Sequence, residues 1–278
     1  SVLFGGIFNV FGDYFFVFTL DLGILGAGLA TAIGVCMSVF MMLTHFRSPI
    51  NTMRIVPVPR MPEMFGKIAA NGFSSFIIDI AMGVLTMLFN RQIMRYLGSD
   101  ALAVYAVIVN ISTFVQCCAY GVGQAAQPII SQNYGAGRSD RVSQLLRYCL
   151  ISCAVIGAAW TAAVVALPNG FINLFMSPTE AVLAIAPEIM RIYAVSFLLL
   201  PYNVFSTYYF QAMLRPGTSV IISVSRGIVI SGALIMLLPL LLGSNSVWWA
   251  MPIAEAATVI YVTASTVKVQ KAFQKSEC

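Results

Sequence analysis

Charged side chains are scarce in this sequence. Only 9% of its 278 residues are Asp, Glu, Lys or Arg, whereas a soluble domain carries about 25%. Hydrophobic residues make up 59% of the chain. A soluble protein of this length could not cover its surface with so few charges, so the composition places the chain in a lipid bilayer.

Residues suited to hydrolytic, metal or redox chemistry are also few. The chain has one histidine, His45, and its six cysteines form no CxxC pair. It contains no P-loop, no Ser-His-Asp set and no zinc-ligand spacing. The net charge of +5 comes from basic residues scattered over short loops, which argues against a nucleic-acid partner. The sequence therefore predicts no enzyme, no metal site and no cofactor.

Long apolar runs dominate what is present. Each predicted run is long enough to cross about 30 Å of hydrocarbon as a helix, and a helix satisfies its own backbone polar groups in lipid. We predict eight such spans, at roughly 1–20, 24–45, 69–90, 101–125, 146–167, 189–212, 219–242 and 247–267. The connecting segment 167–180 is predicted to contain a short interfacial helix. The predicted fold class is an all-α integral membrane protein, a polytopic helical bundle.

The basic residues indicate an orientation. Short cytoplasmic loops of membrane proteins are enriched in Lys and Arg. With eight spans, all but three of the fifteen Lys and Arg residues fall on one side, the exceptions being Arg91, Arg95 and Arg191. We therefore expect the loop around Arg138 and the C-terminus to face the cytoplasm.

Three carboxylates lie inside the apolar spans: Asp13, Asp79 and Glu255. An ionised carboxylate at the bilayer centre costs about 2.5–3.5 kcal/mol on insertion scales. A group that is kept at this cost can carry a proton, or can hold a hard cation such as sodium through its oxygens. These three residues are therefore candidate functional residues.

Asn9 and Asp13 form the clearest polar pair. They are four residues apart and so lie on one face of a helix. Together they offer an amide oxygen and carboxylate oxygens to a single point, which suits a cation. The alternative is a polar pair that joins neighbouring helices.

The rest of the chain carries a more scattered set. Asp79 is near the middle of its span, where it could instead bond to a neighbouring helix. Glu255 follows Pro252, which could break the helix and line a cavity. Gln116 could line a polar path or bond across helices, and Arg226 could pair with a carboxylate or extend to the interface. We predict a secondary polar site at Asp79, Glu255 and Gln116.

Several motifs resemble a known family, the multidrug and toxic compound extrusion (MATE) transporters. GVGQAAQPIISQNYGAGRSDRV, 121–142, resembles that family's signature at the end of its eighth helix and the following cytoplasmic loop. SVSRGIVI, 223–230, and VWWAMPIAEAAT, 247–258, resemble its last two helices. FNVFGDYFFVF with GAGLATAIG resembles its fifth and sixth helices.

The resemblance implies an architecture of twelve helices in two lobes of six. Residues 1–45 would be the last two helices of the N-lobe, and 46–66 a cytoplasmic linker between the lobes. Residues 67–268 would be the six-helix C-lobe, and 269–278 a cytoplasmic tail. We expect the chain, which starts with Ser inside an apolar run, to be a fragment of such a protein and inactive by itself.

The resemblance also implies site residues. The family's N-lobe cation site uses an Asn and an Asp four apart on the fifth helix, matched by Asn9 and Asp13. It also uses a Thr on the sixth helix, matched by Thr31. Other members use carboxylates of the seventh and tenth helices. Asp79 fits the seventh, but the tenth has no carboxylate here beyond Glu188 at its edge, which favours the N-lobe site.

The implied function is a cation-coupled antiporter in the plasma membrane. It would export amphipathic or cationic organic compounds by alternating access, with H⁺ or Na⁺ as the coupling ion, and would be a monomer at full length. The alternative is a flippase for a lipid-linked or polysaccharide precursor, from a related superfamily. A third reading, a membrane scaffold or channel subunit, would leave the intramembrane carboxylates unexplained.

Overall fold

The fold is known from a computed structural model that describes residues 2–49, 51 and 61–275. The described residues form helices and no strands, as predicted. The chain divides into two compact units, Ser1–Met61 and Pro62–Cys278, here called the first and second unit. Residues 50 and 52–60 of the predicted linker over 46–66 fall outside the described residues, and the assignment of the two units to lobes stays a prediction.

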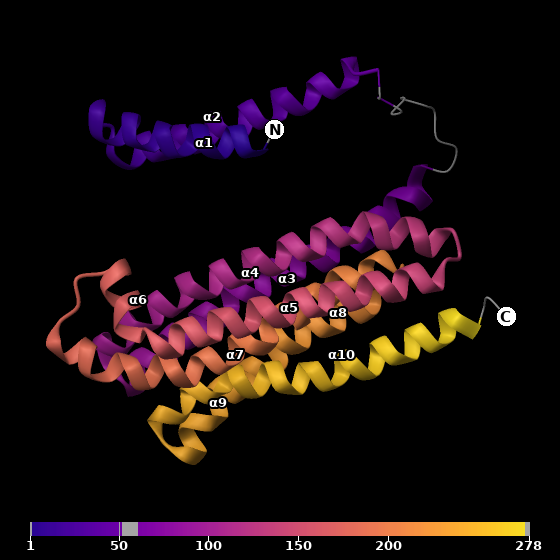
Figure 1. The fold of residues 1–278 in the computed structure, drawn as a ribbon. Helices are drawn as coiled ribbons and strands as arrows, with labels where there is room; N and C mark the ends of the chain where they lie inside the picture. Colours follow the sequence, from indigo (N-terminus) through magenta and orange to yellow (C-terminus); the bar gives the residue numbers. More distant parts are fainter. Residues whose placement is uncertain (1, 50, 52–60, 276–278) are drawn as a thin grey trace. The chain divides into compact units, whose positions relative to one another are not determined.

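The first unit is a pair of helices (Figure 1). Helix α1, Val2–Tyr14, continues directly into a short π-helix, η1, Phe15–Thr19. Helix α2, Gly23–Leu43, follows after a tight turn and ends in a 3₁₀ turn, η2, Thr44–Arg47. The turn places Asp21 at a positive φ of 53°, a conformation that Asp and Asn tolerate better than most residues.

The second unit is a bundle of long helices (Figure 1). The elements in order are α3 Met61–Tyr96, α4 Gly98–Gly135, α5 Ser139–Ala166, α6 Pro168–Phe175, α7 Glu180–Ala212, α8 Pro216–Val224, η3 Ser225–Val229, α9 Ile230–Leu242, η4 Ser244–Trp249 and α10 Ala250–Lys275. Here η3 is a π-helix and η4 a 3₁₀-helix.

Six stretches of helix are long and apolar enough to cross a membrane within the described residues: Gly23–Arg47, Gly98–Gly135, Ser139–Ala166, Glu180–Ala212, Pro216–Leu242 and Ser244–Phe273. They correspond to six of the eight predicted spans. The first predicted span is a shorter apolar helix, Leu3–Thr19, and the third lies within α3. The count of eight therefore stays a prediction.

Helix α7 is central to the core of the second unit. It packs against α4, α5, α8 and α10. Aromatic side chains fill one end, where Tyr105 stacks on Phe89 with 4.9 Å between ring centroids and contacts the Trp248 ring at 6.4 Å. Gly157 lets α5 approach α7 closely, because a Cβ there would lie 2.7 Å from the Leu198 carbonyl oxygen. Close approach at small residues is a usual way for membrane helices to pack.

Candidate functional site

A polar contact joins the two helices of the first unit. The side-chain amide of Asn9 on α1 donates a hydrogen bond to the Thr31 hydroxyl oxygen on α2 at 3.1 Å. The Thr31 hydroxyl in turn donates to the backbone carbonyl of Ala27 at 3.0 Å. Because Asn9 uses its amide nitrogen in this contact, the contact does not involve its carbonyl oxygen, which is an acceptor.

Asp13 lies one turn beyond Asn9 on α1. The residue is half-buried, and its Oδ1 atom is buried without a hydrogen-bond partner among the described residues. Asp13 and Thr31 line the same open groove, whose walls include the small residues Ala27 and Gly28. The structure thus places Asn9, Asp13 and Thr31 on one patch of the α1–α2 pair.

Glycines hold the two helices close enough for these contacts. A Cβ at Gly34 would lie 2.8 Å from the Gly5 carbonyl oxygen, and a Cβ at Gly5 would lie 2.5 Å from the Gly34 carbonyl oxygen. Two residues after Asp13, α1 changes into the π-helix η1. Single π-helical turns of this kind are frequent at functional sites.

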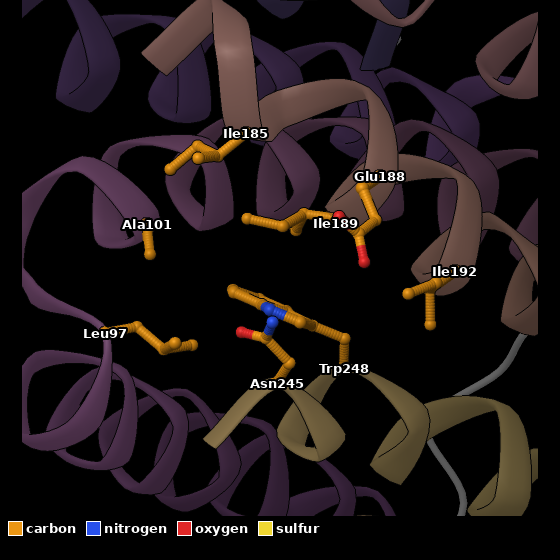
Figure 2. Close-up of a pocket in the computed structure, with 8 residues that line it drawn as sticks. All are labelled: Leu97, Ala101, Ile185, Glu188, Ile189, Ile192, Asn245 and Trp248. Atoms are coloured by element: carbon orange, nitrogen blue, oxygen red, sulfur yellow. The ribbon is translucent and has the colours of Figure 1, made fainter. Parts of the chain in front are cut away.

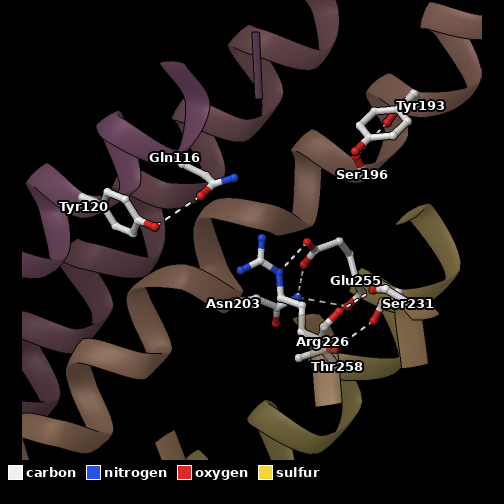
Figure 3. Close-up of polar contacts among 10 residues, drawn as sticks. Gln116, Tyr120, Tyr193, Ser196, Asn203, Arg226, Ser231, Glu255 and Thr258 are labelled. Carbon is white, nitrogen blue, oxygen red and sulfur yellow. Dashed lines mark hydrogen bonds and ion pairs between the residues drawn. The ribbon is translucent and has the colours of Figure 1, made fainter. Parts of the chain in front are cut away.

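Glu255 has the opposite environment (Figure 3). Its side chain is 0% exposed. The Arg226 Nε donates to Glu255 Oε1 at 2.6 Å, and the Asn203 amide donates to Oε2 at 2.6 Å and to the Glu255 backbone carbonyl at 3.0 Å. Both carboxylate oxygens are therefore engaged, and Arg226 balances the charge.

The Glu255 cluster connects three elements. Glu255 comes from α10, Asn203 from α7, and Arg226 from the π-helix η3 between α8 and α9. The Ser231 hydroxyl on α9 donates to the Arg226 backbone carbonyl. Of the two alternatives for Arg226, pairing with a carboxylate is the one that the structure shows.

The other two residues of the predicted secondary site do not join this cluster. Gln116 is buried on α4 and accepts a hydrogen bond from the Tyr120 hydroxyl of the same helix at 3.2 Å, apart from Glu255 in Figure 3. Asp79 belongs to α3, but its side chain lies outside the described residues. The structure does not bring Gln116 to Glu255.

One interpretation of the sequence was wrong. Pro252 does not break a helix, because it is the third residue of α10, directly after the 3₁₀-helix η4. Backbone N–H groups in the first turn of a helix have no intrahelical acceptor, so proline is tolerated there. The irregular backbone near the cluster is instead the π-helix η3, which contains Arg226.

Asn203 is the residue that sequence reasoning missed. It is 0% exposed and donates twice to Glu255. The sequence did contain a signal for it, because Asn203 is a polar residue in the apolar stretch LLLPYNVF of the segment that corresponds to the family's tenth helix. The sequence analysis looked for carboxylates in that helix and did not consider an amide that donates a hydrogen bond to a carboxylate of another helix.

Comparison with known proteins agrees with this arrangement of helices. A profile of the MatE family matches residues 74–237, more than half of the chain. The chain belongs to the MATE family. The matched residues include Asn203 and Arg226, but neither the α1–α2 patch nor Glu255.

Relatives of this MATE chain include curated multidrug export proteins. The "Multidrug export protein MepA" of Staphylococcus saprophyticus is 26% identical over 274 residues, which are 96% of this chain and 60% of the relative. The protein of the same name from Staphylococcus aureus is 25% identical over 250 residues, 89% of this chain and 54% of the relative. The chain thus spans 54–60% of the length of these relatives.

Solved MATE structures have the same fold. A multidrug resistance MATE family transporter of the MOP superfamily, in an outward-facing conformation, matches with a TM-score of 0.89 and 20% identity, over 98% of this chain and 62% of that one. A MOP superfamily transporter from Pyrococcus furiosus, described as having a binding pocket of reverse polarity, matches with a TM-score of 0.88 and 19% identity, over the same shares. Together with the apolar helices, the family membership makes this a multi-pass membrane protein.

Proposed function

We propose that this chain is part of a cation-coupled antiporter that exports amphipathic or cationic organic compounds. The observation that carries the proposal is Asp13, a carboxylate in an apolar helix whose buried Oδ1 has no hydrogen-bond partner among the described residues. The curated relatives, which are named as multidrug export proteins, support the substrate class and a role in transport rather than catalysis.

The coupling ion is a proton or a sodium ion, and Asp13 binds it. Asn9 and Thr31 position the site, because the bond between them joins α1 to α2 beside the carboxylate. For sodium, the Asn9 carbonyl oxygen and the Thr31 hydroxyl oxygen add neutral ligands to the Asp13 carboxylate. For a proton, the carboxyl group alone suffices, and the neighbouring oxygens accept its hydrogen bond.

Neutralisation of Asp13 provides the coupling. A charged carboxylate in an apolar span favours helix arrangements that leave it hydrated, whereas the neutral form tolerates closure by apolar side chains. A ligand shifts a conformational equilibrium by its difference in affinity for the two states. Cation binding and release at Asp13 thus bias alternation between the two access states, and the organic substrate leaves in exchange for the cation.

Glu255 does not serve as the coupling residue in this proposal. Arg226 and Asn203 already engage both of its oxygens, so a cation would have to displace the arginine. Asp79 stays a prediction, because its side chain lies outside the described residues.

The flippase alternative would need cationic side chains inside the spans to bind an anionic precursor. Arg226 is the basic residue that the sequence offers for this, and its guanidinium is paired with Glu255 at 2.6 Å. The pairing removes the charge that a phosphate or sugar acid would need. The antiporter is therefore the better-supported function.

Transport in inverted membrane vesicles tests the proposal. The transporter that contains this sequence is expressed as it occurs, and uptake of ethidium is followed under an imposed proton or sodium gradient. We expect gradient-dependent uptake that Asp13→Asn abolishes at an unchanged protein level. The ion whose gradient drives uptake is the coupling ion.

Asp21→Asn is the matched control, because Asp21 is an exposed aspartate in the turn between the same two helices. It makes the same change of charge and should leave uptake unaltered. Full uptake by Asp13→Asn would move the coupling site to Asp79 and contradict the role of Asp13. No uptake by the unaltered protein under either gradient would contradict the antiporter and favour the flippase or a scaffold.

Location and orientation complete the proposal. We place the protein in the plasma membrane as a monomer, as the family resemblance implies. The Lys and Arg distribution supports an orientation with the Arg138 turn and the C-terminus in the cytoplasm. Labelling of a single cysteine, introduced into a background without native cysteines, tests the orientation. Ser139 is buried and is therefore not a suitable position. An introduced cysteine at exposed Ala136, whose φ is negative, should react with a membrane-impermeant reagent only in inverted vesicles.

A further inference from the structure

A small pocket opens at one end of the second unit (Figure 2). It has a volume of about 140 Å³ and lies where α4 and α7 begin and where α9 leads into η4. Five aliphatic side chains form most of its wall, and three polar residues, Glu188, Asn245 and Trp248, complete it. The four α7 residues among them are spaced i, i+3, i+4 and i+7 from Ile185, so they form one face of that helix.

Trp248 gives this pocket an unused hydrogen-bond donor. Its side chain is 1% exposed, and its indole Nε1 has no hydrogen-bond partner among the described residues. The indole belongs to the aromatic core, where it contacts the Tyr105 ring, so it cannot easily turn toward solvent. In Figure 2 it lies between the Glu188 carboxylate and the Asn245 amide. A buried N–H that lacks an acceptor is an expected place for a ligand oxygen.

Glu188 is the one charged residue in the lining. Glu188 and Asn245 are exposed and form the mouth of the pocket. The buried Ile189 and Trp248 form its floor. Neither Arg191 nor Arg95 forms an ion pair with Glu188 among the described residues: Arg191 Nε donates to the Val165 carbonyl at 3.3 Å, and the Arg95 guanidinium lies 5.3 Å from the Tyr96 ring centroid. The pocket therefore presents a negative charge beside an aromatic ring, a combination that attracts organic ammonium ions.

The volume limits the size of the ligand. An apolar cavity of about 150 Å³ accommodates benzene, so this pocket suits a molecule of about that size. We propose that it is a binding site for a small amino alcohol. The ammonium group lies between the Glu188 carboxylate and the indole, the carbon atoms contact the aliphatic wall, and the hydroxyl oxygen accepts from Trp248 Nε1. The site uses none of the residues proposed for the coupling cation, so its test does not depend on the transport proposal.

The binding of choline and of two close analogues separates the contribution of the ammonium charge from that of the hydroxyl group. Binding is measured by calorimetry on the full chain in nanodiscs of phosphatidylglycerol, a lipid without an amine. The neutral isostere 3,3-dimethylbutan-1-ol keeps the shape and hydroxyl of choline but lacks its charge. Tetramethylammonium keeps the charge but lacks the hydroxyl. We expect choline to bind at least 10-fold more tightly than the isostere, and several-fold more tightly than tetramethylammonium.

Glu188→Gln tests the assigned carboxylate. Because Glu188 is exposed, this change should not disturb folding. It should weaken choline binding about 10-fold and leave the isostere unchanged. Glu180→Gln, which removes an exposed carboxylate from the same helix two turns earlier, should leave choline binding unchanged.

Three results would overturn the site: equal binding of choline and the isostere, an equal effect of the two Glu→Gln changes, or no measurable choline binding. The second of these would assign the effect to the general surface charge. A last comparison identifies the source of the amino alcohol. Loss of choline binding when phosphatidylethanolamine is added to the nanodiscs indicates that a lipid headgroup occupies the site, and unchanged binding indicates a free small molecule.

Discussion

The two units of this chain treat a carboxylate in an apolar helix in opposite ways. In the first unit, Asp13 has a buried oxygen without a hydrogen-bond partner among the described residues, and it lines an open groove. In the second unit, Glu255 is fully buried, and each of its oxygens accepts a hydrogen bond at 2.6 Å. An ionised carboxylate is costly in an apolar span, but only Glu255 has both of its oxygens compensated by hydrogen bonds within the described residues.

The difference indicates which carboxylate can exchange a ligand. A buried charge that an arginine and an amide already satisfy is costly to disturb, because removing either partner leaves the other uncompensated. Such a group fixes a structure, here the contact of α10 with α7 and η3. A carboxylate with an unused oxygen gains from a proton or a metal cation. Substitutions in both units test this difference between Asp13 and Glu255.

The largest expected effect comes from Arg226→Met. It leaves Glu255 buried without a countercharge, and breaking a buried pair in this way costs about 3–5 kcal/mol of unfolding free energy. Denaturant unfolding in detergent, followed by fluorescence of the three tryptophans, measures the loss. The double variant Arg226→Met with Glu255→Met should recover most of it. A loss below about 1 kcal/mol in the single variant would show that Glu255 is not held by Arg226.

Asn203→Leu comes next. Leucine keeps the approximate volume but removes the donor to Glu255 Oε2 and to the Glu255 carbonyl. Leaving buried acceptors unsatisfied costs about 1–3 kcal/mol, measured by the same unfolding assay. Asn110→Leu is the control, because Asn110 is exposed and, within the described part of the chain, its side chain bonds only to the Ala106 carbonyl of its own helix. It should stay within about 0.5 kcal/mol. Equal effects of the two changes would contradict the role of Asn203.

Gly34→Ala should have a smaller effect, confined to the first unit. The new Cβ would lie 2.8 Å from the Gly5 carbonyl oxygen and force α2 away from α1. Overpacking costs about 1–3 kcal/mol, which the better helix propensity of alanine offsets by about 0.5–1 kcal/mol.

Gly6→Ala is the control for this change, because a Cβ at Gly6 meets nothing within 4 Å; it should be neutral or stabilising. Since the shift separates Asn9 from Thr31, Gly34→Ala should also reduce gradient-driven ethidium uptake, whereas Gly6→Ala should not. Normal uptake by Gly34→Ala would show that the close approach of the helices is not needed for coupling.

The smallest effect on stability is expected for Asp13→Asn, which should change the unfolding free energy by less than about 0.5 kcal/mol. It removes a charge whose Oδ1 has no hydrogen-bond partner within the described part of the chain. Glu255→Gln, the equivalent change in the second unit, leaves Arg226 unpaired and should cost several-fold more in the same assay. A similar cost for both would erase the distinction between the two carboxylates.

Much of this could be predicted from the sequence because it depends on local properties. Continuous apolar runs require helices in lipid, and six of the eight predicted spans appear among the described residues. The four-residue spacing of Asn9 and Asp13 is enough to predict that they share one helix face. The short helix α6 and the family also follow from motifs and composition that are read along the chain.

The hydrogen-bond partners of these polar residues depend on the tertiary structure. Thr31 is 22 residues from Asn9, and Glu255 is 29 residues from Arg226 and 52 from Asn203. No local pattern specifies such distances, because the choice depends on which helices pack together and how closely their backbones approach. By sequence, Asp13 and Glu255 are both acids in apolar helices. Only the packed structure shows that Glu255 is paired with an arginine and that Asp13 has a buried oxygen without a hydrogen-bond partner among the described residues.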